Sequence, residues 1–439
     1  MDRTTLAGHV LEYLAAEGVQ LGDDLEQVEQ QLRQAVLQIG AAAMELHLGQ
    51  RRLGYEGSSR ACDGCGHNQK FIAHRPRTLA TLMGQVTLRR AYYHCRHCAA
   101  SCCPYDLQVG LGSGQESVGL AKAAALVATV DPFIPAATLL KELTGQKLGD
   151  RTVHRIARKV GRIVDEQERS AALAMAAWAV PAEQVEAAPR RLYVAVDGVM
   201  VHRRQWNEAK CVCCYWEDEV PGLRRTELAQ DKKPPRHSRY CVRFESIEQF
   251  KAFVWSLAMR CGLEQAVEVV LLGDGAAWIW DHIAPILGER VICITDWYHV
   301  MEHLWACGNS LFSPGTAQAS AWVKQRETWL WEGRWEQLLE DLRQCKRQTR
   351  SIPRQEALAS LMTYLGHQGK RLDYARFRSM GLDIGSGRVE SACKHVVQSR
   401  MKRSGMIWSE DGAQRMLSLR CAYLNGHWNR LWATHPLAA

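Results

Sequence analysis

The sequence predicts an α+β protein of several domains, and three observations support this prediction. The chain has 439 residues, about three times the length of an ordinary domain. Two CxxC pairs flank a stretch that alternates like β-strands. Farther along, short apolar strands alternate with helical segments, and a long helical stretch follows. These changes of pattern predict six regions: 1–60, 61–105, 106–180, 190–300, 301–380 and 381–439.

The composition is that of a folded protein. Hydrophobic residues make up 47% of the chain and charged residues 23%, which excludes wholesale disorder. The N-terminus lacks the pattern of a signal peptide, and the longest nearly apolar run, 171–182, is too short to cross a bilayer. We therefore expect a cytoplasmic protein with no membrane partner. In such a protein 16 cysteines indicate metal ligands or buried thiols, and a net charge of +8 permits binding to a polyanion.

The first two regions are expected to be a helical segment and a zinc ribbon. Apolar residues recur every three or four positions between residues 21 and 48. Residues 61–105 contain two short knuckles, CDGCGH and CRHC, and each presents two thiolates for a tetrahedral structural Zn²⁺. Six basic residues against one acid in this region favour contact with nucleic acid. The expected zinc ligands are Cys62, Cys65, Cys95 and Cys98, with unrelated buried thiols as the alternative and Cys102 or Cys103 as a substitute ligand.

Residues 106–180 are expected to form a DNA-binding region of the helix-turn-helix type. A short helix from Pro135 to Leu143, ended by Gly145, precedes a second helix that begins at Asp150 or Arg151. The second helix has one apolar and one basic face, so it could lie in a major groove, although two ordinary surface helices with a solvated basic face would give the same pattern. The expected DNA contacts are Arg151, Arg155, Arg158 and Lys159.

Residues 190–300 are expected to form a core of the ribonuclease-H-like type. Three consecutive strands are followed by alternating helices and strands, which is not a regular α/β repeat. Cysteines on these strands are expected to be small core residues. The predicted strands are 191–199, 209–216, 238–244, 267–274 and 290–295, the predicted helices are 246–260 and 276–287, and the core cysteines are Cys211, Cys213, Cys214 and Cys241.

Three acids are expected to form a catalytic site on this core. Asp197 and Asp274 each end an apolar strand, where a carboxylate is costly unless its charge is compensated. In this topology the two strands are neighbours, and converging carboxylates repel unless they share a proton or hold a cation. Hard oxygen ligands suit Mg²⁺ or Mn²⁺, and two such ions can promote phosphodiester chemistry. The third acid is Glu390, in the first turns of a helix after the Gly-rich segment 381–389.

Further residues are expected to assist these acids. Asp296 and His299 are auxiliary candidates: Asp296 is either a helix N-cap or the replacement for Asp274, and His299 with His303 has a spacing that could bind Zn²⁺. Residues 301–380 are expected to be a helical insertion. Its aromatic stripe is expected to form the core, with a base-stacking platform as the alternative; the stripe consists of Trp322, Trp329, Trp331 and Trp335. The basic residues expected to hold phosphates near Glu390 are Lys394, Arg400, Lys402 and Arg403.

Four motifs stand in sequence order: DGVMVHRR (197–204), LGDGAAWIW (272–280), TDWYHVMEHLW (295–305) and ESACKHVVQSRMKRSGMIWS (390–409). They resemble the motifs of bacterial insertion-sequence transposases of the ISKra type, relatives of the Mutator-like transposases in the Asp-Asp-Glu group. The resemblance implies a Mg²⁺-dependent enzyme that cuts at element ends and joins the freed 3′-hydroxyl to target DNA, with Asp197, Asp274 and Glu390 in the catalytic positions. It also implies a nucleoid-associated protein that acts as at least a dimer on paired DNA ends.

Two other classes of function remain open at this stage. A DNA-binding regulator would use the zinc ribbon and the helix-turn-helix and carry an inactive core. A nuclease of the same fold would cut DNA without joining it. All three acids are present and none of the predicted strands is interrupted, which favours the enzyme that joins DNA ends.

Overall fold

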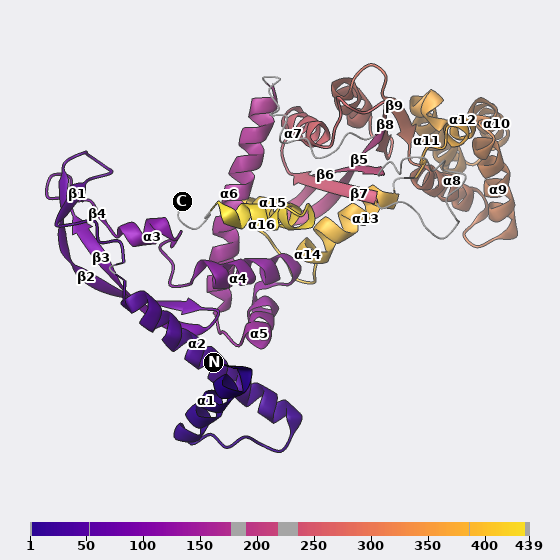
Figure 1. Cartoon of the computed structure of the whole chain (residues 1–439). Helices are drawn as coiled ribbons and strands as arrows, with labels where there is room; N and C mark the ends of the chain where they lie inside the picture. Colours follow the sequence, from indigo (N-terminus) through magenta and orange to yellow (C-terminus); the bar gives the residue numbers. More distant parts are fainter. Residues whose placement is uncertain (1, 52, 177–189, 218–235, 386, 435–439) are drawn as a thin grey trace. The chain divides into compact units, whose positions relative to one another are not determined.

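The computed structural model describes residues 2–51, 53–176, 190–217, 236–385 and 387–434 (Figure 1). The chain forms two compact units, one of Met1–Ile163 with Gly426–Ala439 and the other of Val164–Asn425. Both units contain helices and a sheet, which confirms the predicted α+β, multidomain organisation. The end of the apolar run 171–182 lies outside the described residues. No helix among the described residues is long and apolar enough to span a membrane.

The first unit begins with two helices, α1 (Arg3–Ala16) and α2 (Leu25–Gly49). Each is capped by an aspartate: Asp2 accepts a hydrogen bond from the Thr5 backbone N–H, and Asp24 accepts one from the Gln27 backbone N–H. Helix α2 confirms the helix predicted between residues 21 and 48. It packs on the first sheet through a small apolar cluster that includes Ala41, Val86 and Leu88.

The first sheet is antiparallel, in the order β1-β2-β3-β4. Its strands are β1 (Ser59–Ala61), β2 (Asn68–Thr81), β3 (Gly84–His94) and β4 (Ser101–Cys102). Strands β2 and β3 form the predicted hairpin, which closes at Thr81 and Gly84. The short helix α3 (Pro104–Gln108) follows, and its Asp106 pairs with both Arg77 and Arg90. Two of the six basic residues of this region are therefore paired within the protein, and they share one carboxylate.

Three helices complete the first part of the chain: α4 (Val118–Val130), α5 (Phe133–Thr144) and α6 (Asp150–Ala176). Gly145 ends α5 with a φ of 72°, in the left-handed region that favours glycine, and its N–H donates to the Lys141 carbonyl. The two helices and the turn predicted here are confirmed. The apolar face of α6 is buried in the first unit at Val153, Ile156, Ala157 and Val160. The last helix, α16 (Trp428–Ala433), also belongs to this unit.

The second unit is built on a five-stranded sheet in the order β7-β6-β5-β8-β9. Strands β7, β6 and β5 are antiparallel, whereas β5, β8 and β9 are parallel. The four predicted core cysteines of this sheet are buried, as expected. The strands are β5 (Arg191–Arg203), β6 (Gln205–Glu217), β7 (Arg236–Arg243), β8 (Glu268–Gly273) and β9 (Ile292–Thr295).

One face of this sheet packs on α7 (Ile247–Arg260) and on the turns after β8. The prediction of a regular helix over 276–287 is wrong in part. The chain instead forms the π-helical turn η2 (Ile279–Ile283) and the 3₁₀ turn η3 (Ala284–Leu287). Pro285 stands in η3, and a proline cannot donate the N–H that a continuing helix requires. Ile279, Ile283 and Leu287 still face the core, so the apolar residues of this segment are buried although the helix is irregular.

The predicted insertion is helical throughout. It consists of α8 (Trp297–Phe312), α9 (Ala317–Trp331), α10 (Trp335–Gln348), α11 (Ile352–Gln368), the 3₁₀ turn η4 (Gly369–Leu372) and α12 (Tyr374–Ser379). Trp322 is buried in its core as expected, and the buried Arg326 lies over the Trp322 ring and pairs with Asp341. Trp331, however, is 44% exposed, so the tryptophans do not form one buried stripe.

The last part of the second unit returns to the sheet. It comprises α13 (Gly387–Ala392), the π-helical turn η5 (Cys393–Gln398), α14 (Ser399–Met401) and α15 (Glu410–Leu424). Helix α15 lies against β7, and Asn425 pairs with both backbone groups of Tyr240 at 2.8 and 2.9 Å.

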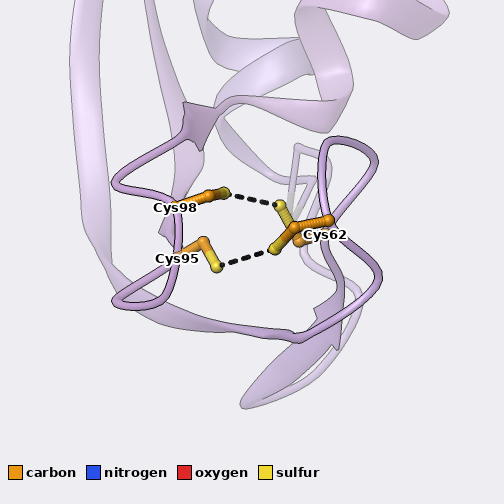
Figure 2. A group of neighbouring side chains, drawn as sticks. Cys62, Cys95 and Cys98 are labelled. Atoms are coloured by element: carbon orange, nitrogen blue, oxygen red, sulfur yellow. Dashed lines mark hydrogen bonds between the residues drawn. The ribbon is translucent and has the colours of Figure 1, made fainter.

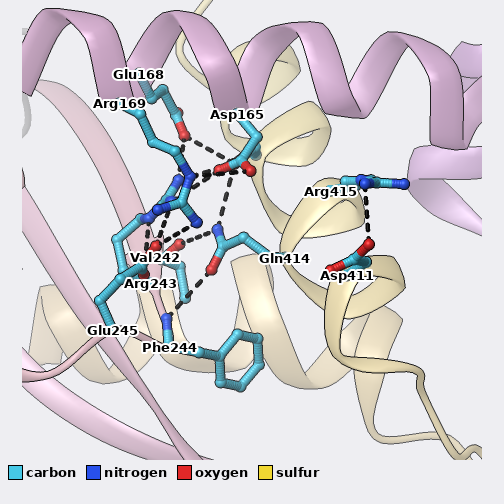
Figure 3. Close-up of polar contacts among 11 residues, drawn as sticks. Asp165, Glu168, Arg169, Val242, Arg243, Phe244, Glu245, Asp411, Gln414 and Arg415 are labelled. Carbon is cyan, nitrogen blue, oxygen red and sulfur yellow. Dashed lines mark hydrogen bonds and ion pairs between the residues drawn. The ribbon is translucent and has the colours of Figure 1, made fainter.

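A buried ion cluster joins the second half of α6 to the edge of this sheet (Figure 3). The fully buried Arg243 of β7 forms ion pairs with Asp165 at 2.7 Å, Glu168 at 3.0 Å and Glu245 at 2.6 Å. Burial raises the pKa of Glu168 although Arg243 acts in the opposite direction. A buried guanidinium is tolerated here because three carboxylates surround it.

Candidate metal centre and acidic site

The four predicted zinc ligands come together in the first unit. The sulfur atoms of Cys62, Cys65, Cys95 and Cys98 all lie within 4.8 Å of one another. The sulfur atoms of Cys62 and Cys98 lie 3.6 Å apart, and so do those of Cys65 and Cys95. Figure 2 shows Cys95 and Cys98 pointing from one knuckle toward the knuckle of Cys62. Tetrahedral Zn²⁺ with bonds of about 2.3 Å would place neighbouring sulfur atoms about 3.8 Å apart. The cluster therefore has the size and the ligand type to hold a structural zinc ion.

The backbone of each knuckle favours thiolates. Burial raises the pKa of Cys62, but hydrogen bonds from the backbone N–H groups of Gly64 and Cys65 and from the side chains of Cys98 and Cys65 outweigh it and lower that pKa to about 6. The pKa of Cys65 rises instead: the backbone N–H of His67 lowers it, but hydrogen bonds with the other three thiols, together with burial, outweigh that effect. Backbone N–H groups of Cys98 and His97 lower the pKa of Cys95 in the same way. Such N–H···S bonds stabilise the negative charge that a zinc ligand must carry.

The neighbouring cysteines lie outside this cluster. Cys102 accepts a hydrogen bond from Arg60 at 3.2 Å and donates to Gln69 at 3.2 Å, and Cys103 is not part of the group either. The substitution of a ligand by Cys102 or Cys103 is therefore not supported. His67 and His97 stack at 3.7 Å beside Cys65, and their ring nitrogens form a second group of possible ligands with its sulfur.

Two of the three predicted catalytic acids share one edge and one face of the second sheet. Val196 of β5 is in register with Gly273 of the parallel strand β8. Asp197 and Asp274 are the next residues along the chain, so they occupy equivalent positions where the parallel pairing of β5 with β8 ends, although β5 itself continues to Arg203. Because side chains alternate along a strand, both point away from the core face occupied by Val196. The predicted convergence of these two acids follows from this register.

Asp197 experiences the charges of both other acids. Burial raises its pKa most strongly, and the negative charges of Asp274 and Glu390 raise it further, whereas hydrogen bonds from Cys393 and from the Gly198 N–H lower it. The Gly198 N–H donates to Asp197 Oδ1 at 2.7 Å. The balance is a raised pKa. Repulsion among converging carboxylates is the condition under which a cation would stabilise the site.

The third acid, Glu390, lies on α13, which packs against β5 and β6 on the face that carries Asp197. Its carboxylate is 3.7 Å from the Lys394 amino group. The three acids are farther apart than the cysteines of the cluster. Among the described residues, no three possible metal ligands that include a carboxylate have their ligand atoms within 4.8 Å of one another. π-helical turns follow both Asp274 and Glu390, and such turns occur often at functional sites.

Asp296 has the structural role that was predicted as its alternative. It is buried, and its side chain caps α8 by accepting a hydrogen bond from the Tyr298 N–H at 3.0 Å. The Asp296 N–H also donates to the Gly273 carbonyl, one residue before Asp274. His299 Nε2 lies 3.2 Å from His303 Nε2, but the two histidines are not part of any group of three possible ligands in the described chain.

Two residues that no local pattern marks hold the second acid in place. Tyr364 of α11 donates to the Asp274 carbonyl at 2.7 Å, and Gln368 donates to the Gly275 carbonyl at 3.0 Å. Gly275 has a φ of 104°, and a Cβ there would lie 2.8 Å from Tyr364 and 2.9 Å from Gln368. The helical insertion therefore supports the loop of Asp274. Only Gly275, directly after the acid, gives a sequence signal for this tight contact.

The basic residues after Glu390 are not equivalent. Lys394, Lys402 and Arg403 are exposed, as a phosphate contact requires. Arg400 is fully buried, with its guanidinium 5.1 Å from the centre of the Trp408 ring. The direct DNA contact predicted for Arg400 therefore disagrees with this placement. The apolar environment of Val396, Val397 and Met401 on the same short helices places it inside the protein.

The basic face of α6 is likewise only partly available. Arg151 and Arg158 are exposed. Arg155 is occupied by an ion pair of 2.7 Å with the buried carboxylate of Glu116. Burial, together with Arg162 and Arg155, lowers the pKa of Lys159. Arg155 is therefore paired within the first unit, and Lys159 is half-buried there. The helical pattern alone could not predict either contact.

Comparison with known proteins places the chain in one family. Residues 22–432 match the model of the uncharacterised protein family UPF0236, and the chain belongs to that family. The chain is also similar to the UPF0236 protein in vanSb 3'region of Streptococcus gallolyticus. The two are 23% identical over 358 residues, which cover 80% of this chain and 73% of the relative. The match therefore extends through both units.

Proposed function

We propose that this protein is a DNA transposase that cuts phosphodiester bonds at element ends and joins the 3′-hydroxyl ends to target DNA. The placement of Asp197 and Asp274 carries the proposal. The two acids stand at equivalent positions on neighbouring parallel strands, and Glu390 comes from a helix on the same face. Acids at the carboxyl ends of parallel strands are well placed to bind a ligand at the sheet edge.

The strand order supports the same proposal. Three antiparallel strands, β7, β6 and β5, continue into the parallel strands β8 and β9. This is the arrangement expected for a ribonuclease-H-like core, and a helical insertion between the second and third acids is expected for the ISKra-type and Mutator-like transposases. The acids and the insertion therefore stand in the order that the resemblance implies.

The donors at the site are suited to Mg²⁺ or Mn²⁺. Asp197, Asp274 and Glu390 offer hard oxygen atoms, and burial, with a smaller contribution from the charges of the other two acids, raises the pKa of Asp197. Two bound ions would activate an attacking hydroxyl and stabilise the leaving oxygen. The protein itself would orient the acids: the Gly198 N–H fixes the Asp197 carboxylate, and Tyr364 fixes the backbone of Asp274. The three carboxylates need to draw closer to bind the ions together.

Exposed basic residues can hold the DNA backbone. Lys394 and Lys402 follow Glu390 in the second unit, and Arg151 and Arg158 are exposed on α6 in the first. Cations of this kind neutralise phosphates and position a duplex without reading its sequence. The zinc ribbon contributes Lys70 as an exposed basic residue. DNA ends and target DNA are therefore the proposed partners, and two paired ends require at least a dimer.

A plasmid assay tests the proposal. The donor plasmid carries the DNA that flanks the gene on both sides, and the purified full-length protein is added with Mg²⁺ or Mn²⁺. We expect cleaved donor and joined products from the wild type, and neither from Asp197→Asn or Glu390→Gln. Glu336→Gln is a matched control, because Glu336 is an exposed acid of α10 in the helical insertion.

The other outcomes point to the alternative functions. Nicked DNA without joined products would indicate a nuclease. DNA binding without any cleavage, unchanged by substitution of the acids, would indicate a DNA-binding regulator. Loss of Mg²⁺-dependent activity in Glu336→Gln as well as in the acid variants would contradict the assignment of the three acids.

A further inference from the structure

The hairpin between β5 and β6 extends well beyond the acids. Asp197 lies in the middle of β5, and the pairing with β6 continues for six further residues to Arg203, opposite Gln205. At about 3.3 Å per residue, His202 lies roughly 17 Å farther along the strand than Asp197. Neither β8 nor β7 pairs with this part of the hairpin, since their registers end at Gly273 and Arg243.

The tip of this hairpin carries an exposed aromatic side chain. Trp206 is 59% exposed, although tryptophan is a residue that usually buries most of its surface. Its ring stacks on His202 of the opposite strand, with centroids 5.1 Å apart and planes inclined by 23°. This contact holds the indole in a defined orientation while leaving most of it accessible. The hairpin also exposes Met200, which is 45% accessible.

One cation lies near the exposed indole, and a second stands at the turn of the hairpin. The Lys402 amino group lies 5.9 Å from the centre of the Trp206 ring, and the Trp408 N–H donates to the His202 carbonyl, which attaches the segment after Glu390 to the hairpin. Arg204 is exposed at the turn and forms no ion pair with any residue in the described part of the chain. The acid of this hairpin, Glu208, is directed toward Lys210 at 3.4 Å.

Arg204 occupies a costly backbone conformation. Its φ is 57°, in the left-handed region where glycine or asparagine is favoured at a tight turn. An arginine at this position places a long cation at the end of the hairpin where a smaller residue would fit the turn better. Such an outlier, together with the exposed indole and Lys402, suggests a binding function.

We propose that the tip of the β5–β6 hairpin binds DNA beside the cut site and that Trp206 stacks on an unpaired base there. This inference rests on the proposed function. Aromatic rings stack on bases of any sequence, and Arg204 and Lys402 would hold the phosphates on either side. The spacing of roughly 17 Å corresponds to about five base pairs between the bound base and the acids. The absence of an unpaired acid at the tip, among the described residues, fits a polyanion and not a basic protein partner.

Binding to two probes tests this inference. The probes are a fluorescein-labelled single strand of 12 thymidines and a blunt mixed-sequence duplex of 20 base pairs, measured by anisotropy with the full-length protein. We expect Trp206→Ala to weaken binding to the single strand about tenfold and to change duplex binding by less than twofold. Trp206→Phe should retain most of the affinity. Trp331→Ala is the matched control, because Trp331 is also exposed but lies in the helical insertion.

The turn residue gives a second variant that preserves the fold. Arg204→Gly relieves the left-handed strain, so it should keep or raise the urea midpoint of unfolding while weakening binding to both probes and reducing the salt dependence. Single-strand affinity unchanged in Trp206→Ala, or reduced equally in Trp331→Ala, would overturn the proposal. Equal losses on the two probes in Trp206→Ala would also overturn it, because stacking requires an unpaired base.

These results are separable from the test of catalysis. If Trp206→Ala weakens single-strand binding but the wild type never cleaves DNA, the hairpin binds DNA and the proposed transposase activity fails. If the wild type cleaves and joins DNA while Trp206→Ala binds the single strand normally, the activity stands and the inference about the hairpin fails.

Discussion

Replacement of the buried Arg243 by methionine should destabilise the second unit strongly. The guanidinium is fully buried and forms ion pairs of 2.6–3.0 Å with Asp165, Glu168 and Glu245. Its removal leaves three largely buried carboxylates with Arg169 as the remaining cation of the cluster shown in Figure 3. Breaking a buried ion pair on one side costs about 3–5 kcal/mol, because the remaining charge is not compensated.

The free energy of unfolding is measured by urea titration, with Arg415→Met as the control. Arg415 pairs with Asp411 on the adjacent helix α15 at 3.0 Å, but Asp411 is mostly exposed, and such surface pairs contribute about 0–1 kcal/mol. We expect Arg243→Met to lose about 4 kcal/mol and Arg415→Met less than 1 kcal/mol. Adding Glu168→Gln to Arg243→Met should recover part of the loss. If Arg243→Met lowers the free energy of unfolding by less than about 1 kcal/mol, the charge of Arg243 does not stabilise the cluster and the reasoning is refuted.

Three further predictions concern the two sites. The purified wild type should contain about one Zn²⁺ per chain by metal analysis, and the double variant Cys62→Ser and Cys95→Ser should contain none; a zinc-free wild type would contradict the metal centre. Gly275→Ala should reduce DNA cleavage at least tenfold while zinc content stays unchanged, because its Cβ would collide with Tyr364 beside the second acid; wild-type activity would contradict this support. Without divalent ions, Asp197→Asn should be more stable than the wild type at pH 7, because burial and the neighbouring acids raise the pKa of Asp197 and make its ionised form unfavourable. This difference in stability should shrink as the pH falls through the raised folded-state pKa toward the ordinary pKa of an aspartate, and a difference that is constant with pH would contradict it.

The sequence predicted the parts of the fold that depend on local pattern. The CxxC spacing identified all four cysteines that come together, and the apolar strands predicted which residues enter the core. The ends of β5 and β6 were missed because the segment MVHRRQWNE, residues 200–208, is too polar to resemble a buried strand. Its pairing continues because the two strands are joined by a tight turn at Arg204 and because apolar residues of the hairpin, Val201 and Ala209, are still buried.

The candidate site was predicted less completely, since its details depend on contacts between distant segments. The approach of Asp197 and Asp274 followed from strand order, which the apolar pattern indicates. The support of the Asp274 loop by Tyr364 depends on how the insertion folds back, about 90 residues later in the chain. The burial of Arg400 could not be inferred from charge pattern, because an exposed and a buried arginine look alike in sequence.

The central claim is that the acids of the second unit join DNA ends, and strand transfer measures it directly. Linear DNA that ends in the gene-flanking sequence is incubated with a supercoiled target plasmid, Mg²⁺ and the full-length protein. The proposal predicts target plasmids joined to the linear DNA through its 3′ ends with the wild type, and none with Asp197→Asn, which retains the hydrogen-bond acceptor for the Gly198 N–H. Joined products in equal amounts from the wild type and from Asp197→Asn, or from neither when both are folded and bind the DNA, would contradict it.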